Sequence, residues 1–218
     1  MSSRPQADTD RWRDARAALR AADPRMAALV EEEPALDPDR VAGDWAADVW
    51  SALVVQVLSQ QLSSASAAAI DRRLKALHDG RLPTPAEMLE LDASTLRGLG
   101  LSWAKADYLH DLAARLVDGR LDVERLSMLD DDAARDELTK VKGVGRFTAD
   151  GVLMFALHRP DVWPAADLAL RRAVERIWGL DPPASVEQVD ALGERFRPWR
   201  TLAAAYLYSL PQKESRSR

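Results

Sequence analysis

One short stretch, Lys142-Gly143-Val144-Gly145, constrains the fold most, because it places two glycines between two segments of helical character. Glycine adopts positive φ without a steric penalty, so this spacing allows a tight reversal of the backbone. The apolar side chains that would hold the two segments together are Leu138, Val141, Val144 and Ala149. The stretch therefore predicts a pair of helices joined by a turn, with the second helix beginning at about Arg146.

The rest of the sequence has helical periodicity almost throughout and lacks the alternation of β-strands, which predicts an all-α fold. A Pro- and Asp-rich stretch at 34–44 predicts a linker, and a long apolar helix follows it from about Trp45 to Gln61. Residues able to cap the next helices are Ser63 or Ser64, Thr84 and Ser102.

The composition excludes several classes of site and of protein. Because the chain has no cysteine, it can hold no disulfide, no cysteine-ligated zinc and no iron–sulfur cluster. It lacks the apolar core of a secretory signal and any run of about 18 apolar residues. We therefore expect a cytoplasmic protein that does not associate with membranes.

The charge of the chain is unevenly distributed. The formal net charge of −5 and the pI of about 5.3 argue mildly against a nucleic-acid partner. However, residues 138–172 hold six basic and three acidic side chains, a net of +3, whereas residues 1–50 hold seven and eleven, a net of −4. A small positive face on an acidic chain is still compatible with DNA binding.

The turn itself offers a way to bind phosphate. Several backbone N–H groups would point outward from the first turn of a helix that begins at Arg146, and such an end binds a phosphate oxygen without any basic side chain. A plain pair of helices joined by a glycine turn is the competing interpretation. The full spacing, Leu-x-x-Val-x-Gly-Val-Gly-x-x-Thr-Ala, is far more specific than the two glycines alone.

This spacing resembles the helix-hairpin-helix motif of proteins that bind DNA without sequence specificity. The loop at 158–168, which ends in an aspartate before the next helix, resembles the second half of the helix-hairpin-helix DNA glycosylase signature. Three more stretches are similar to the 3-methyladenine DNA glycosylase II branch of that superfamily: 57–70, 99–119 and 197–208. The resemblance spans roughly residues 45–210.

The resemblance implies an all-α fold of two helical subdomains with a central cleft. Residues 1–44 and 160–218 would form one subdomain. Residues 45–159 would form the other, with the hairpin at about 133–158. The N-terminal β domain of some members would be lacking.

The resemblance also assigns a catalytic residue. Asp167 matches the aspartate that stabilises positive charge on the deoxyribose while the glycosidic bond breaks. An ordinary N-cap is the competing role for Asp167, and the two roles are compatible. Of the rival carboxylates, Asp161 is expected to be a turn residue and Asp150 to lie on a solvated helix face.

Members with strand-cleaving lyase activity place a lysine three residues before Asp150, where this chain has Phe147. Because phenylalanine cannot form a Schiff base, we expect base removal without strand cleavage.

The remaining site residues are implied in the same way. The base pocket would be lined by Phe147, Tyr208, Gln60 and Trp163, of which Trp163 is the weaker candidate. Gln61 or Leu62 would fill the gap that a flipped base leaves in the duplex, although exposed glutamines at a helix C-terminus are the simpler interpretation. The DNA phosphates would be bound by Lys142, Gly143, Val144, Gly145, Arg146 and Thr148. The backbone carbonyls of Thr139, Val141 and Val144 would hold a structural Na⁺ or K⁺.

The sequence thus predicts a monofunctional DNA glycosylase that hydrolyses the N-glycosidic bond of alkylated bases, with no required cofactor. Its partner would be double-stranded DNA with a damaged base. We expect a monomer without an obligate protein partner, associated with the nucleoid when bound to DNA. Three alternatives stay open: a non-catalytic DNA-binding module, a glycosylase for other damaged bases, and an unrelated helical interaction domain, which the acidic charge favours.

Overall fold

The computed structural model describes residues 11–38 and 46–210. These residues form helices and no strands, which confirms the prediction of an all-α fold. The chain divides into two compact units: unit 1 comprises Met1–Ala42 and Arg159–Arg218, and unit 2 comprises Gly43–His158. None of the helices in the described ranges combines the length and the apolar character that crossing a membrane requires.

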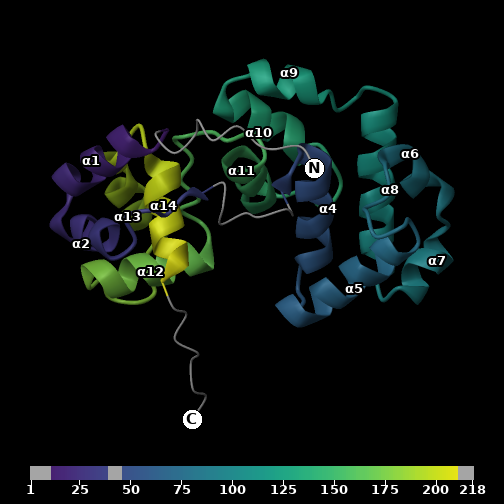
Figure 1. The fold of residues 1–218 in the computed structure, drawn as a ribbon, viewed down its shortest axis with the longest axis horizontal. Helices are drawn as coiled ribbons and strands as arrows, with labels where there is room; N and C mark the ends of the chain where they lie inside the picture. The colour runs from purple at the N-terminus through teal and green to yellow at the C-terminus, as the bar shows by residue number, and fades with distance from the viewer. Residues whose placement is uncertain (1–10, 39–45, 211–218) are drawn as a thin grey trace, which may run out of the picture. The chain divides into compact units, whose positions relative to one another are not determined.

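Unit 1 brings together the two ends of the described chain, so that purple and yellow helices lie beside each other (Figure 1). Its helices are α1 (Arg13–Ala22), α2 (Pro24–Glu32), α12 (Leu168–Trp178), α13 (Val186–Gly193), the 3-10 helix η3 (Glu194–Phe196) and α14 (Arg200–Ser209). α14 packs against α1, α2 and α12, and its residues 201–207 are all buried. α14 is therefore the core helix of unit 1.

Asp23 ties the N-terminal helices of unit 1 to the C-terminal ones. Its buried carboxylate caps α2 by accepting from the Arg25 N–H, and it also accepts from Trp178 Nε1 at 3.0 Å and Arg195 Nη1 at 2.9 Å. Burial opposes the ionisation of this carboxyl, but the hydrogen bonds outweigh it and lower the Asp23 pKa. Phe196 packs between the rings of Trp163 and Trp178, with ring centroids 6.0 and 5.9 Å away.

Unit 2 is built on two central helices, α4 (Val49–Ser59) and α8 (Trp103–Val117). Its other helices are α5 (Ser64–Ala76), α6 (Pro85–Glu90), α7 (Ala93–Gly98), α9 (Val123–Met128), α10 (Asp131–Thr139) and α11 (Arg146–Phe155). α8 packs against α4, α6 and α7, whereas α11 packs against α4 and α10. α4 begins later than expected, and Trp45 and residues 39–44 of the expected linker lie outside the described residues.

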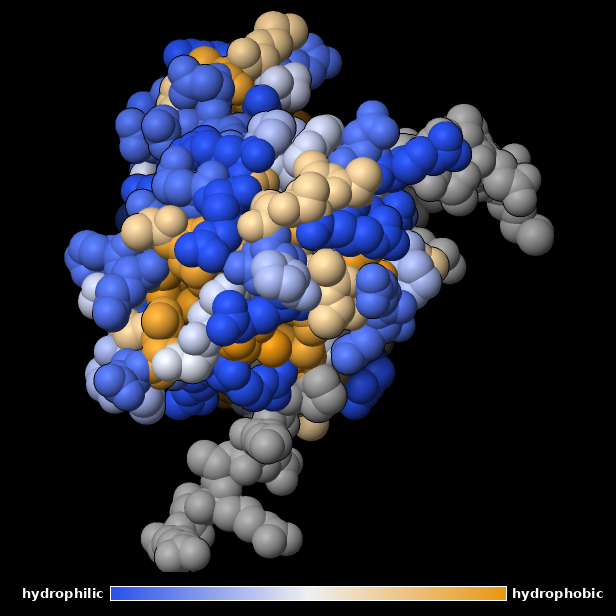
Figure 2. Space-filling model, turned by 90° about the vertical axis from the view of Figure 1, so that its left-hand side faces the viewer, coloured by the Kyte–Doolittle hydropathy of each residue, from blue (hydrophilic) through white to orange (hydrophobic). Residues whose placement is uncertain are grey.

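Local sequence signals explain where many helices begin. The hydroxyls of Ser63 and Ser102 accept from backbone N–H groups in the first turns of α5 and α8, and Thr84 forms a full capping box with Glu87 at the start of α6. These three expected caps are confirmed. In the face shown in Figure 2, hydrophilic side chains predominate and hydrophobic ones show between them, as expected when most apolar side chains lie inside.

The expectation that Asp150 lies on a solvated helix face is wrong. Asp150 is only 4% exposed, because its face of α11 packs against α10. Arg135 of α10 reaches the carboxylate with Nε at 2.7 Å from Oδ1, so the buried charge is paired. Burial nevertheless raises the pKa of Asp150, against the lowering effect of Arg135.

This pair gives a stability prediction. Replacing one partner of a buried ion pair leaves an uncompensated charge, so Arg135→Met should lower the free energy of unfolding by about 3–5 kcal/mol at pH 7. A raised pKa in the folded state means that stability is lost as the pH rises through that pKa. The deficit should therefore shrink as the pH falls from 7 towards 5, because the raised pKa favours protonation of Asp150, which removes the uncompensated charge.

Urea denaturation of the wild type, of Arg135→Met and of a control variant, at pH 7 and at pH 5, measures this deficit. Arg125→Met is the matched control, because Arg125 lies 3.9 Å from Glu137 and is mostly exposed. It should cost less than about 1 kcal/mol. A deficit for Arg135→Met that is no larger than the control, or independent of pH, would contradict the prediction.

Candidate functional site

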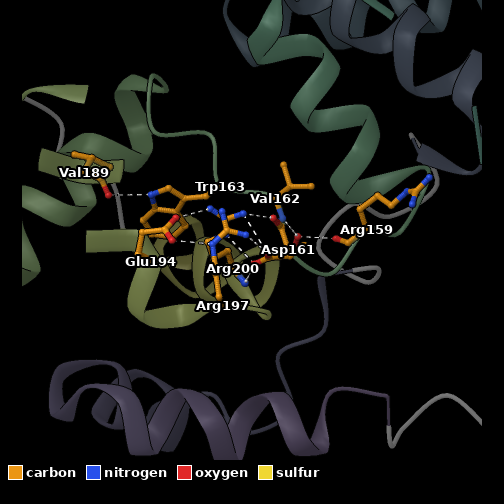
Figure 3. A network of polar contacts seen from close by, with 9 residues as sticks. Arg159, Asp161, Val162, Trp163, Val189, Glu194, Arg197 and Arg200 are labelled. Atoms are coloured by element: carbon orange, nitrogen blue, oxygen red, sulfur yellow. Dashed lines mark hydrogen bonds and ion pairs between the residues drawn. The ribbon is translucent and has the colours of Figure 1, made fainter. Parts of the chain in front are cut away.

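In unit 1, the loop that leads to α12 is fixed by an ion-pair cluster (Figure 3). The carboxylate of Asp161 accepts from Arg197 Nη1 at 2.6 Å and from Arg200 Nε at 2.7 Å. Arg200 also donates from Nη2 to the Asp161 carbonyl at 2.9 Å. Arg200 is partly buried, with 12% of its side chain exposed, so these hydrogen bonds hold the loop more firmly than a solvent-exposed pair would.

The backbone of the same loop is held by Thr201. The buried Thr201 hydroxyl donates to the Arg159 carbonyl at 2.6 Å and accepts from the Val162 N–H at 3.0 Å. The Thr201 N–H donates to the Pro160 carbonyl at 3.0 Å. Thr201, at the start of α14, thus fixes three consecutive peptide units of the loop. This loop leads to the start of α12.

Asp167 lies at the end of this loop and is the N-cap of α12. Its Oδ1 accepts from the Ala169 N–H at 3.1 Å, and its Oδ2 accepts from the Tyr208 hydroxyl at 2.5 Å. The partial positive charge of a helix N-terminus favours a carboxylate at this position. Asp167 is half-buried, and its neighbour Leu168 is exposed. An oriented negative charge therefore lies beside apolar surface.

Trp163, a predicted pocket residue, contributes to the core of unit 1. It is 8% exposed, and its Nε1 donates to the Val189 carbonyl at 3.0 Å (Figure 3). The ring lies directly against Gly193, where an added Cβ would come within 2.5 Å of Nε1. The structure therefore gives Trp163 a packing role.

In unit 2, the predicted hairpin consists of α10, a turn, and α11. Its four expected apolar contacts, Leu138, Val141, Val144 and Ala149, are all buried. Gly143 has φ +75°, and an added Cβ would come within 2.2 Å of the Tyr108 ring. The turn thus needs glycine at 143 both for its backbone conformation and for its close approach to α8.

The start of α11 has no side-chain cap. Its N-cap is Gly145, whereas the preceding helices of unit 2, from α4 to α10, begin with a capping Asp, Ser or Thr. The N–H groups of Arg146, Phe147 and Thr148 lie in the first turn, where a helix provides no partner for them. Arg146 and Phe147 are exposed, whereas Thr148 is buried.

The hairpin turn is braced by α8. The Asp111 carboxylate accepts from the Lys142 N–H at 2.9 Å and from Arg115 Nε at 2.8 Å. Burial opposes the ionisation of Asp111, but these donors outweigh it and lower its pKa. The Lys142 ammonium lies 3.2 Å from Asp107 in an exposed pair, which leaves it accessible to a stronger anion.

Gln60 is engaged with the hairpin as well. Its Nε2 donates to the Gly143 carbonyl at 2.9 Å, so the tip after α4 and the hairpin turn are tied together. Gln61 has φ +56°, which is uncommon for a residue other than glycine, and Leu62 is 40% exposed. The buried Lys105 ammonium holds the preceding turn by donating to the Leu58 carbonyl at 2.7 Å, and burial lowers its pKa.

The predicted residues therefore fall into two groups. Asp167, Tyr208 and Trp163 belong to unit 1, and the hydrogen bond between the first two was not foreseen. The hairpin and tip residues belong to unit 2. Within the described residues, no cluster of three or more His, Asp or Glu side chains is arranged to hold a metal ion.

Sequence reasoning missed the residues that support these groups. In unit 1 these are Arg197, Arg200 and Thr201, together with Asp161, which does more than form a turn. In unit 2 they are Tyr108 and Asp111. Arg197, Arg200 and Thr201 lie in the 197–208 stretch. That stretch carries part of the resemblance to the family, but the sequence alone assigned these three residues no role.

Comparisons with known proteins agree with this architecture. The family model of the HhH-GPD superfamily base excision DNA repair proteins matches residues 54–198. DNA-3-methyladenine glycosylase 1 of Schizosaccharomyces pombe is 35% identical over 158 residues, which cover 72% of this chain and 69% of that protein. The putative DNA-3-methyladenine glycosylase YfjP of Bacillus subtilis is 33% identical over 126 residues, or 58% of this chain and 44% of that protein.

A solved structure is similar over nearly the whole chain. The 3-methyladenine DNA glycosylase Mag1 of Schizosaccharomyces pombe, in complex with abasic DNA, aligns with a TM-score of 0.76 at 30% identity. The alignment covers 89% of this chain and 95% of that one. The similarity therefore extends across both units.

The geometry at the hairpin gives a second prediction. Gly143→Ala would place a side chain at positive φ and against the Tyr108 ring, so it should lower the free energy of unfolding by about 2–4 kcal/mol. Gly145→Ala is the matched control, because Gly145 has φ −92° and an added Cβ meets nothing within 4 Å. It should cost less than about 1 kcal/mol. Urea denaturation compares them, and equal effects would refute this account of the turn.

Proposed function

Because this chain belongs to the HhH-GPD superfamily of base excision DNA repair proteins, we propose that it removes alkylated bases of the 3-methyladenine type from double-stranded DNA. The reaction is hydrolysis of the N-glycosidic bond. The observation that carries the proposal is the Asp167 carboxylate, half-buried at the N-terminus of α12 and oriented by two donors.

The chemistry needs a fixed negative charge. As a purine N-glycosidic bond breaks, positive charge develops on the deoxyribose, and a nearby carboxylate stabilises that charge and orients the attacking water. A carboxylate has about four lone-pair positions, and two are used by Ala169 and Tyr208. Asp167 thus keeps acceptor positions for water and retains its charge for the sugar.

Aromatic faces supply selectivity for the base. An alkylated purine such as 3-methyladenine carries positive charge, and a desolvated aromatic face attracts a cation by up to about 2 kcal/mol. Phe147 is 60% exposed in the first turn of α11, and Tyr208 carries its ring beside Asp167. We assign to each of these two residues the role of offering an aromatic face to the base, whereas Trp163 packs in the core of unit 1 and Gln60 holds the hairpin turn.

DNA is bound by the hairpin. The N–H groups at the start of α11 and the turn from Gly143 to Gly145 take a phosphate, with Lys142 and Arg146 adding positive charge. Gln61 and Leu62 form an exposed tip that can fill the gap left by a flipped base. With Phe147 where the lyases have lysine, the reaction leaves the strand intact.

We further propose that the protein acts as a monomer, without an obligate protein partner or a required cofactor. It would be cytoplasmic and associated with the nucleoid when bound to DNA.

A monovalent cation would complete the hairpin. The carbonyl oxygens of Thr139, Val141 and Val144 form a neutral donor set, which suits Na⁺ or K⁺ better than a divalent ion. Val141 already accepts from the Val144 N–H at 3.1 Å, and its second lone pair stays available. When bound, the cation would supply a positive charge opposite a DNA phosphate.

Cation exchange tests this assignment. Affinity for duplex DNA would be measured in potassium, sodium and tetramethylammonium chloride at equal ionic strength, so that counterion release is held constant. We expect weaker binding in tetramethylammonium, which is too large for the three carbonyls. Equal affinities in the three salts would rule out the cation.

The catalytic assignment is tested with duplex DNA that contains one methylated purine. The wild type should release the free base, and strand breaks should appear only after alkali. Asp167→Asn keeps an N-cap and an acceptor for Tyr208 but removes the charge, so the single-turnover rate should fall about 100-fold or more. Asp190→Asn, on the exposed face of α13, is the control and should excise like the wild type.

Each result has a distinct meaning. Equal release by the wild type and Asp167→Asn would remove Asp167 from the mechanism. Breaks without alkali would contradict hydrolysis without strand cleavage. No release from a panel of alkylated, deaminated and oxidised bases would favour a non-catalytic DNA-binding module.

A further inference from the structure

The hydroxyl of Tyr208 makes a contact that an aromatic pocket wall does not require. It donates to Asp167 Oδ2 at 2.5 Å, within the range of short hydrogen bonds to a charged acceptor. Tyr208 lies in the last turn of α14, just after the buried stretch of that helix, and it is half-buried. The ring therefore leaves the core at the point where the carboxylate lies.

The two donors to Asp167 act on different oxygens. The Ala169 N–H belongs to the first turn of α12 and takes Oδ1, whereas the Tyr208 hydroxyl belongs to α14 and takes Oδ2. A single donor would leave the carboxylate free to rotate about its Cβ–Cγ bond. Two donors from two packed helices define the plane of the carboxylate as well as its position.

We propose that Tyr208 is a positioning residue for the glycosylase reaction, acting through its hydroxyl on Asp167. The proposal rests on the function proposed above. The hydroxyl fixes the half-buried carboxylate in one orientation, in which it keeps acceptor positions that its two donors do not use. Without it, Asp167 would sample other rotations, and fewer encounters would have the charge correctly placed.

The same helix offers a contrast. Tyr206 is fully buried, and its hydroxyl donates to a neutral acceptor, the Glu33 carbonyl, at 3.1 Å. That bond joins α14 to the end of α2, far along the chain from Asp167, and has a purely structural character. Two phenols on one helix thus serve different ends, and each can lose its hydroxyl by substitution with phenylalanine.

The test uses the full chain with Tyr208→Phe, and Tyr206→Phe as the matched control. Two quantities are measured: the single-turnover rate of release of a methylated purine, and the affinity for duplex DNA that contains a tetrahydrofuran abasic analogue. For Tyr208→Phe we expect the rate to fall about tenfold or more, as for the loss of one hydrogen bond to a charged group. Its affinity for the abasic duplex should stay within about twofold, because the ring is retained.

Tyr206→Phe should lower the melting temperature and leave the rate unchanged. The decisive comparison is made in the Asp167→Asn background, where Tyr208→Phe should cause no further loss, because the hydroxyl acts only through the carboxylate.

Several outcomes overturn the inference. An unchanged rate for Tyr208→Phe removes the hydroxyl from the reaction, and an equal loss of rate and of affinity makes it a binding residue. Additive effects of Tyr208→Phe and Asp167→Asn would show that the hydroxyl acts independently of Asp167. If the wild type releases no base at all, the proposed function fails first, and that result is distinct from release that Tyr208→Phe leaves intact.

Discussion

The ion pairs of Asp161 with Arg197 and Arg200 are the constraint on which the candidate active site depends. They hold a loop that has little regular structure of its own, and that loop determines where α12 begins. Because Asp167 is the N-cap of α12, its carboxylate can be no better placed than the loop before it. The partial burial of Arg200 and its several hydrogen bonds to Asp161 make this brace stronger than an exposed pair.

The hairpin explains how a chain with a net negative charge can bind DNA. The phosphate-binding groups proposed for it are mainly backbone N–H groups at the uncapped start of α11, which add no formal charge. The turn is supported by Asp111 and Tyr108 of α8 and by Gln60 after α4. Of these side chains, Tyr108 and Gln60 are neutral. A net charge of −5 is therefore compatible with binding, because the charge near the turn, and not the total, meets the phosphates.

The sequence predicted features that depend on neighbouring residues. The structure confirms the caps at Ser63, Thr84 and Ser102 and the buried apolar side chains that join the two helices of the hairpin. Both features follow from spacings of a few residues. It could not predict contacts between distant residues. The hydrogen bond between Tyr208 and Asp167 joins residues that are 41 positions apart in the sequence, and the one between Gln60 and Gly143 joins residues that are 83 positions apart. The environment of Asp150 was misjudged for the same reason, since only the packing of α10 shows which face of α11 is covered.

The environment of Asp167 also bears on which bases this chain can release. The Asp167 carboxylate accepts two hydrogen bonds from two helices, so it offers a fixed negative charge that can stabilise positive charge on the sugar. The chain has phenylalanine and not lysine at position 147, and the Asp150 carboxylate is buried and paired with Arg135. Such a site suits a glycosidic bond that is already weakened by positive charge on the base. Alkylated purines have that property, whereas most neutral damaged bases need an acid or a nucleophile to help them leave.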